Sequence, residues 1–460
     1  MLAAQLIRHW NPEDRGFWER DGRRVAARNL RLSIAALTLA VAVWTVWSVV
    51  VVNLPAAGFR YSTNQLFWLA ALPGLTGATL RIFYAFAVPV FGGRRFTTFA
   101  TASLLAPAIG IGLAVQDPAT PYEAMVALAL LCGLGGGNFA SSMAHISFFY
   151  PSTRQGYALG LNAGLGNLGV SLVQLVVPLV IGAGLFGAAG GPPQPGAQGP
   201  MWLQNAGFVW VPFIVLAALG CWFGMNDLAD VKAGFAEQAV IFRRRHNWLL
   251  SWLYLGTFGS FIGFSAGLPL LVTSQFPGVD ALHFAWIGPL VGALARPLGG
   301  WLADRVGGAR VTLWVFAALA AGVLGVLACL PGAGAAGGAG HFGGFVASFL
   351  VLFAAAGLGN GSTFRMIPVV FVAERLRAAE RTPAAQAQAT REGNREAAAV
   401  LGFASAIGAY GGFFIPKSWG SSIALTGGPA AALVLFIVFY LSCIALTWWH
   451  YGRRYAPLPC

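Results

Sequence analysis

The chain has 460 residues, of which 57% are hydrophobic and only 9% are charged, while the formal net charge is +13. Soluble domains carry about 25% charged residues, so this composition excludes an ordinary soluble protein. A surplus of basic residues could indicate a nucleic-acid partner. The distribution of these residues along the chain excludes that interpretation. The five cysteines are scattered, with neither a disulfide framework nor a metal-binding spacing.

Apolar runs recur along the whole chain, and each is long enough to cross a bilayer, which takes about 20 residues in a helix. The first run is too long for a cleaved signal peptide, so we expect it to be the first span. The pattern predicts an all-α membrane protein with twelve transmembrane helices. The expected spans are residues 32–52, 65–91, 96–115, 122–149, 156–185, 206–224, 247–272, 283–303, 311–331, 343–372, 397–416 and 429–449.

The charged residues between these runs predict how the chain crosses the membrane. Of the 28 lysines and arginines, seven precede the first span and sixteen more fall in alternate connections. The opposite connections hold only Arg60 and Lys417. By the positive-inside rule, both termini are expected in the cytoplasm. The basic surplus is thus explained by topology and by contact with the lipid bilayer, and we expect no nucleic-acid partner.

Three polar stretches interrupt the apolar pattern. Residues 187–200 are rich in Gly and Pro and predict a loose loop outside the cytoplasm. Residues 227–246 predict a cytoplasmic linker, and residues 374–396 a second cytoplasmic connection. We therefore expect an N-terminal six-helix bundle with a cytoplasmic segment at residues 1–226, the linker at 227–246, and a C-terminal six-helix bundle at 247–460.

The two expected bundles share an internal repeat. GATLR, ten residues and GGRRFT at 77–97 match GALAR, ten residues and GGARVT at 292–312, with an offset of 215. GLGGGNF at 133–139 also matches GLGNGST at 357–363. Parallel repeats about an axis along the membrane normal are typical of the major facilitator fold. The repeat therefore predicts two pseudo-symmetric six-helix bundles.

Arg81 and Arg296 are permanent cations at equal depth in this repeat, each eleven residues before a glycine pair that ends a span. Eleven helical residues cover about 16 Å, which is near the middle of a bilayer core. All 15 acidic residues are expected in loops or at span ends, with Glu123 and Asp304 the deepest. Without a buried carboxylate as partner, the two guanidiniums predict a site for a mobile anion, and structural ion pairing is the weaker alternative.

Further side chains on the spans are candidates for the walls of this site. Asn167, Ser171 and Gln174 form one polar stripe at helical spacing, and Asn138, Ser142 and His145 form another. Helix–helix contact is an equal alternative for any one of these residues. Arg365 is a third cation within a span, lining an exit path or reaching the interface. His145 is the candidate for proton coupling, because histidine titrates near neutral pH.

Several motifs closely resemble the NarK-type nitrate/nitrite porters of the major facilitator superfamily. The resemblance covers nearly the whole chain, and its glycine-rich segments are the most specific part. The matching stretches are NPEDRGFW (11–18), RNLRLSI (28–34), GGGNFASSM (135–143), QGYALGLNAGLGNLGVSLVQ (155–174), FGMNDLAD (223–230), TFGSFIGFSAG (257–267) and IGAYGGFFIPKSWGSSIALTG (407–427).

The resemblance implies a bacterial inner-membrane transporter, used in nitrate respiration or assimilation, that binds nitrate and nitrite. It implies that Arg81 and Arg296 hold the anion and that Phe139 and Phe258 stack on it. Asn167 and Tyr254 would complete the site. The family commonly has Asn in place of His145, and some members have a neutral residue in place of Arg365, so the coupling ion is left open.

We expect nitrate/nitrite antiport by alternating access, with no cofactor and with the monomer as the working unit. The alternative is nitrate/proton symport, with His145 or the bound anion carrying the proton. A membrane enzyme would need a catalytic constellation within the spans, such as a His pair or a Cys cluster, and the sequence shows none. An anion channel is a further alternative, which saturating counter-transport would argue against.

Overall fold

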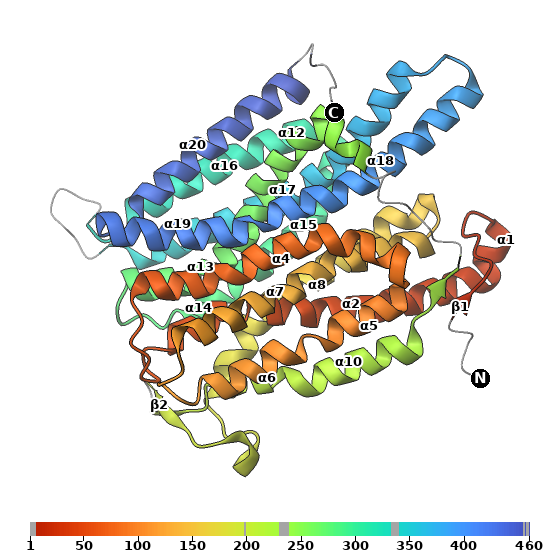
Figure 1. The fold of residues 1–460 in the computed structure, drawn as a ribbon. Coiled ribbons are helices and arrows are strands. Elements are labelled where there is room, and N and C mark those ends of the chain that lie inside the picture. Colours follow the sequence, from red (N-terminus) through yellow and green to blue (C-terminus); the bar gives the residue numbers. More distant parts are fainter. Residues whose placement is uncertain (1–5, 197–198, 230–238, 333–339, 454–455, 457–459) are drawn as a thin grey trace.

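The computed structural model describes residues 6–196, 199–229, 239–332, 340–453, 456 and 460. Long helices run side by side through the molecule, and two short strand pairs decorate its ends (Figure 1). Before residue 230 the helices are α1 (Arg15–Phe17), α2 (Arg23–Thr45), α3 (Trp47–Asn53), α4 (Thr63–Phe91), α5 (Gly93–Ala102), α6 (Leu105–Ala114), α7 (Tyr122–Phe149), α8 (Ser152–Ile181), α9 (Asn205–Phe208) and α10 (Trp210–Gly224).

The helices after residue 238 form a second set of similar size. They are α12 (Arg245–Tyr254), α13 (Ser260–Gln275), α14 (Leu282–Ala285), α15 (Ile287–Val306), α16 (Gly308–Cys329), α17 (Phe342–Ala378), α18 (Pro383–Ala409), α19 (Gly411–Thr426) and α20 (Ala430–Thr447). Three π-helical turns are η1 (Trp18–Gly22), η4 (Leu255–Gly259) and η5 (Trp448–Gly452), and two 3-10 turns are η2 (Gly187–Gly190) and η3 (Ala239–Arg243).

The membrane-spanning pattern expected from the sequence is present in the structure. Within the described residues, eleven helical segments are long and apolar enough to cross a bilayer. A twelfth helix, α15, has 20 residues but carries Arg296, Asp304 and Arg305, which lower its apolar character. Together these segments make the all-α, twelve-helix architecture that the composition predicts.

The internal repeat is visible in the packing. Gly92 ends α4 with φ 85° and Gly307 ends α15 with φ 96°, a left-handed conformation that favours glycine. α4 packs along α7, and α15 packs along α17. A methyl group on Gly136 would lie 2.7 Å from the Cα of Gly77, and one on Gly357 would lie 2.1 Å from the carbonyl oxygen of Gly292. The glycine runs therefore let equivalent helix pairs approach closely in both sets.

Both ends of the chain lie at the end of the bundle where α4 and α15 finish. β1 (Leu6–Ile7) pairs in parallel with β4 (Asp227–Leu228), next to the α4–α5 turn. The carbonyl of Cys460 accepts a hydrogen bond from Ala309 N, just past Gly307. Figure 1 shows β1 and α1 at one end of the bundle and the β2–β3 hairpin at the opposite end.

Two of the polar stretches are more ordered than the sequence suggested. Most of 374–396 is helical, because α17 runs to Ala378 and α18 starts at Pro383, leaving a short turn in place of the predicted connection. Thr382 caps α18, and the residues that follow are rich in strong helix formers. In 187–200, β2 (Gln194–Gly196) pairs antiparallel with β3 (Gly199–Met201) where a loose loop was expected. Of the predicted linker, residues 230–238 lie outside the described part.

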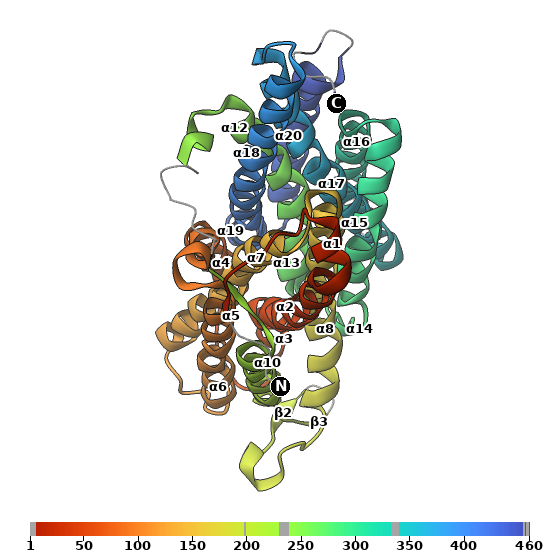
Figure 2. The same cartoon turned by 90° about the vertical axis from the view of Figure 1, so that its right-hand side faces the viewer.

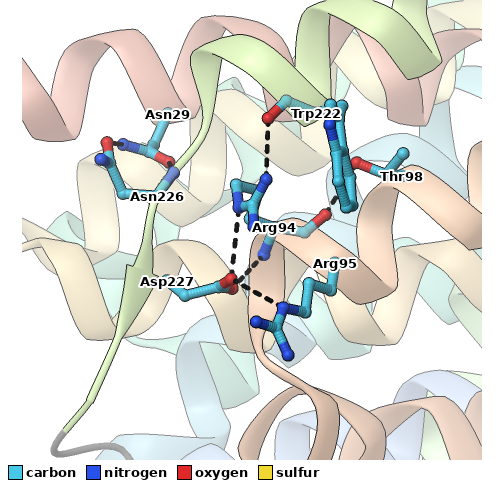
Figure 3. A network of polar contacts seen from close by, with 7 residues as sticks. All are labelled: Asn29, Arg94, Arg95, Thr98, Trp222, Asn226 and Asp227. Carbon is cyan, nitrogen blue, oxygen red and sulfur yellow. Dashed lines mark hydrogen bonds and ion pairs between the residues drawn. The ribbon is translucent and has the colours of Figure 1, made fainter. Parts of the chain in front are cut away.

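Asp227 is a buried carboxylate just past the end of α10, at a span end, and the sequence pattern does not single it out. Asp227 is 7% exposed, and its carboxylate accepts hydrogen bonds from the backbone N–H of Arg94 (2.8 Å) and from Arg94 Nε (3.3 Å) (Figure 3). Arg95 Nε lies 3.9 Å from the same carboxylate. Asp227 thereby caps the N-terminus of α5, where a carboxylate is favourable. It neutralises Arg94 and is no partner for the two central arginines.

Candidate anion site

Arg81 lies within α4 and is completely buried. Its Nε donates to the carbonyl of Gly136 on α7 (2.8 Å), and its Nη1 donates to the carbonyl of Ser405 on α18 (3.0 Å). The guanidinium thus joins helices from both sets. The GGG run at 135–137 makes this possible, because it brings the α7 backbone close to α4.

Arg296 on α15 is 6% exposed and is held much more loosely. Its Nη2 donates to the hydroxyl of Tyr254 at 3.4 Å, a long hydrogen bond. Its guanidinium carbon lies 5.2 Å from the centre of the Phe364 ring. Tyr254 is the last residue of α12, so the contact is made within the second set of helices.

Aromatic rings connect the two arginines. The guanidinium carbon of Arg81 lies 4.6 Å from the centre of the Phe139 ring and 5.0 Å from that of Phe258. Phe258 stacks on Tyr254 with 5.5 Å between ring centres, and Tyr254 contacts Arg296. The π-helical turn η4 carries Phe258, a backbone irregularity that often marks functional sites. The structure therefore brings Arg81, Arg296, Phe139, Tyr254 and Phe258 together.

Several buried polar atoms of the two arginines and of α8 have no partner within the described residues. They include Nη2 of Arg81, Nη1 of Arg296, Oδ1 of Asn167 and Oγ of Ser171. Among those residues neither Arg81 nor Arg296 takes part in an ion pair; their hydrogen bonds go to carbonyls and a hydroxyl. An unpaired buried guanidinium is costly, so the two arginines offer positive charge and free N–H donors to a small anion.

The other expected site residues lie elsewhere. Gln174 is fully buried, and its Nε2 donates to Ser48 Oγ (3.1 Å) and to the carbonyl of Ser265 (2.8 Å), so it links α8 to α13. Arg365 forms an ion pair with Asp304 near the end of α15, where both side chains are about half exposed. That contact gives Arg365 a carboxylate partner that the two central arginines lack.

His145 is buried at the end of the bundle where α4 finishes. Its ring lies directly against Gly93 and packs edge-on against Phe149, with ring centres 4.9 Å apart. It lines a cavity of about 400 Å³ together with Arg94, Arg95 and Asp227. The structure does not bring His145 into contact with the central aromatic stack.

Comparison with known proteins places this fold in a family. A family description, Major Facilitator Superfamily, matches residues 32–385. The chain belongs to the major facilitator superfamily. It is 50% identical to nitrate/nitrite transporter NarU of Escherichia coli (strain K12), across 98% of this chain and 97% of that protein. It is 42% identical to probable nitrate/nitrite antiporter NarK2 of Thermus thermophilus, across 99% and 98% of the two chains.

A solved transporter structure has the same fold. The inward-facing, unoccupied crystal structure of a bacterial homologue of the human lysosomal transporter Spinster matches with a TM-score of 0.61 and 16% identity. The match covers 92% of this chain and 96% of that one. The level of identity to NarU and NarK2 further places the chain in the NarK-type family.

The sequence of this superfamily member did not reveal every contact at the site. The ring of Trp44 lies 5.0 Å from the Arg81 guanidinium, and Phe364 lies over Arg296. Neither aromatic residue stands out among the 16 Trp and 34 Phe of the chain. The carbonyls of Gly136 and Ser405 could not be found from side-chain patterns, because any residue supplies a carbonyl.

Proposed function

We propose that the chain exchanges nitrate for nitrite, with Arg81 and Arg296 acting as an anion clamp. The observation that carries this proposal is the pair of buried guanidiniums, which have free N–H groups and no carboxylate partner among the described residues. A guanidinium is a planar, permanently charged fork that suits flat oxyanions. The names of the NarU and NarK2 relatives point to the same two anions.

The aromatic rings define where the anion would lie. Phe139 and Phe258 have ring centres 6.2 Å apart and are tilted by 31°. A flat ion between two rings needs about 7 Å, twice the usual contact distance of about 3.5 Å. We infer that the two rings separate by roughly 1 Å as the anion enters. Asn167 and Tyr254 would then supply the remaining polar contacts.

The clamp explains why exchange is favoured over uniport. Arg81 and Arg296 come from the two sets of helices, and bringing them together without an anion places two like charges in a medium of low dielectric. The empty carrier is therefore disfavoured in the closed intermediate, while the loaded carrier can reorient. This asymmetry between loaded and empty carrier is the requirement for antiport.

The topology of the proposal follows from the charge distribution. We place both termini in the cytoplasm of a bacterium, with the chain in the inner membrane and working as a monomer. The division into bundles at residues 1–226 and 247–460, joined by 227–246, agrees with the repeat. The end of the molecule where α4 begins is then the extracytoplasmic end.

Proteoliposomes test the proposal directly. Vesicles loaded with nitrite should take up external nitrate quickly, whereas empty vesicles should take up little. Uptake into empty vesicles that follows an imposed pH gradient would instead indicate proton symport. In that case His145 would be the first residue to replace. Absence of nitrate uptake under every condition would contradict the proposed substrate.

A further inference from the structure

A continuous contact surface joins the two sets of helices at the end where α4 begins. We call it the α4–α19 seam and define it by Asn64, Trp68 and Gly74 of α4 with Gly412, Lys417 and Gly420 of α19. The two helices lie side by side in Figure 1 and in the turned view of Figure 2. Further inward the contact continues through the hydrogen bond between Thr79 Oγ1 and the Tyr410 hydroxyl (2.9 Å).

Glycines make the seam tight. A methyl group on Gly74 would lie 2.3 Å from the carbonyl carbon of Gly412, and one on Gly420 would lie 2.6 Å from the Cβ of Phe67. Trp68 also packs against Phe413, with ring centres 5.8 Å apart. Backbones that approach this closely leave no passage between the helices, so the seam is closed in this structure.

Lys417 is the charged residue within this seam. Its Nζ lies 4.6 Å from the centre of the Trp68 ring and donates to Asn64 Oδ1 (3.3 Å) across the seam. It also donates to Ser421 Oγ (2.7 Å) on its own helix. No ion pair of Lys417 occurs within the described residues, so an aromatic face and neutral oxygens satisfy its charge.

We propose that Lys417 is a gating residue that closes the seam against Trp68 and Asn64 and, when the seam opens, binds the incoming oxyanion. The inference rests on the proposed exchange of nitrate and nitrite. In alternating access the two sets of helices must part at this end, which breaks the contacts of Lys417 with α4. Its ammonium is then left without partners on α4, beside the route to the central site. An incoming anion replaces the lost contacts.

This role differs from that of a merely structural lysine because it acts at one face of the membrane. The ammonium would raise the local concentration of anions at the end where α4 begins. When the route opens to the opposite face instead, Lys417 keeps its contacts with Trp68 and Asn64 in the closed seam, and the seam separates its ammonium from that face. The KM for nitrate should therefore depend on Lys417 at one face only.

The test compares Lys417→Met with the wild type in right-side-out and inside-out membrane vesicles. We expect the KM for nitrate to rise about tenfold at the face where α4 begins, the lower end of what charge focusing achieves. At the other face the KM for nitrate should change less than about twofold, because a solvent-exposed charge far from the substrate contributes little. Lys417→Arg should restore the wild-type KM. If the Met variant does not accumulate in the membrane, Lys417→Gln replaces it.

Arg60→Gln is the matched control, because Arg60 is an exposed cation at the same end but outside the seam. It should leave both KM values near those of the wild type. An equal rise of KM at both faces in Lys417→Met, no rise at either face, or the same rise in Arg60→Gln would overturn the proposal. A wild type that transports no nitrate would contradict the proposed function instead.

Discussion

Arg81 and Arg296 occupy equivalent positions in the two repeats, yet the protein holds them differently. Two backbone carbonyls at 2.8 and 3.0 Å fix Arg81, and three aromatic rings surround its guanidinium. Arg296 has one long hydrogen bond to Tyr254 and one ring beside it. The symmetry of the fold therefore sets the position of both charges but leaves their freedom unequal.

The difference suggests a division of labour within the anion clamp. Arg81 is a fixed element, because moving its guanidinium would break charged hydrogen bonds that are each worth about 1.5–3 kcal/mol. Arg296 can adjust to the anion at lower cost. Variants of Arg81 and Arg296 should therefore differ in the size of the transport defect and in whether stability is also lost.

Arg81→Lys should give the largest loss of transport. A lysine ammonium cannot reproduce the planar fork that contacts Gly136, Ser405 and the anion together. Losing at least one charged hydrogen bond should lower kcat/KM about 100-fold, measured as nitrate/nitrite exchange in proteoliposomes. Arg365→Lys is the control, because Arg365 pairs with Asp304 near the end of α15. A nearly normal flux in Arg81→Lys would contradict the fixed role.

Asp227→Asn tests a buried arginine that does have a carboxylate partner. Arg94 and Asp227 are both buried, and the variant leaves the Arg94 charge without compensation. The free energy of unfolding should fall by about 3 kcal/mol, measured by thermal unfolding in detergent. The KM for nitrate should stay unchanged, because the pair lies away from the clamp. A selective loss of nitrate affinity would instead connect Asp227 to the substrate site.

Arg296→Lys should mainly weaken binding. The variant keeps the charge and loses only a long hydrogen bond within the protein, so the thermal stability should change little. Without the second fork the KM for nitrate should rise about tenfold, the effect of one charged hydrogen bond. A stability loss as large as that of Arg81→Lys would show that the two arginines are held equally.

Tyr254→Phe should have the smallest effect. It removes the hydroxyl that accepts from Arg296 and keeps the ring that stacks on Phe258. The expected rise in KM is about threefold, the low end of the range for a neutral hydrogen bond. Tyr440→Phe, which removes a hydroxyl bonded to Ser260, is a comparable control. A loss as large as that of Arg296→Lys would mean that the hydroxyl itself contacts the anion.

The twelve-helix architecture was predictable because membrane-spanning helices are recognisable in a sequence by their length and apolar character. The offset of 215 residues between GATLR and GALAR was enough to place the two arginines in equivalent helices. Helix ends were predicted poorly around 374–396, since the amphipathic parts of α17 and α18 continue beyond the apolar runs. Hydropathy predicts the part of a helix that lies within the membrane core. It does not predict how far the helix extends beyond that core.

The environment of the site was less predictable than its main residues. Contacts of Arg81 with backbone carbonyls leave no trace in residue identity. The burial of Asp227 depends on β1 and β4 meeting across more than 200 residues of chain, which no local pattern reveals. The polar stripe on α8 also concealed different roles, because Gln174 links α8 to α13 while Asn167 Oδ1 has no partner in the described residues.

An experimental structure with nitrate bound would show whether Arg81 and Arg296 hold the anion together. We expect one nitrate between Phe139 and Phe258, with both Arg81 and Arg296 donating to its oxygens within about 3.2 Å. The two rings should lie about 7 Å apart in that structure. Nitrate bound elsewhere, or held by only one of the two arginines with the rings still 6.2 Å apart, would contradict the clamp.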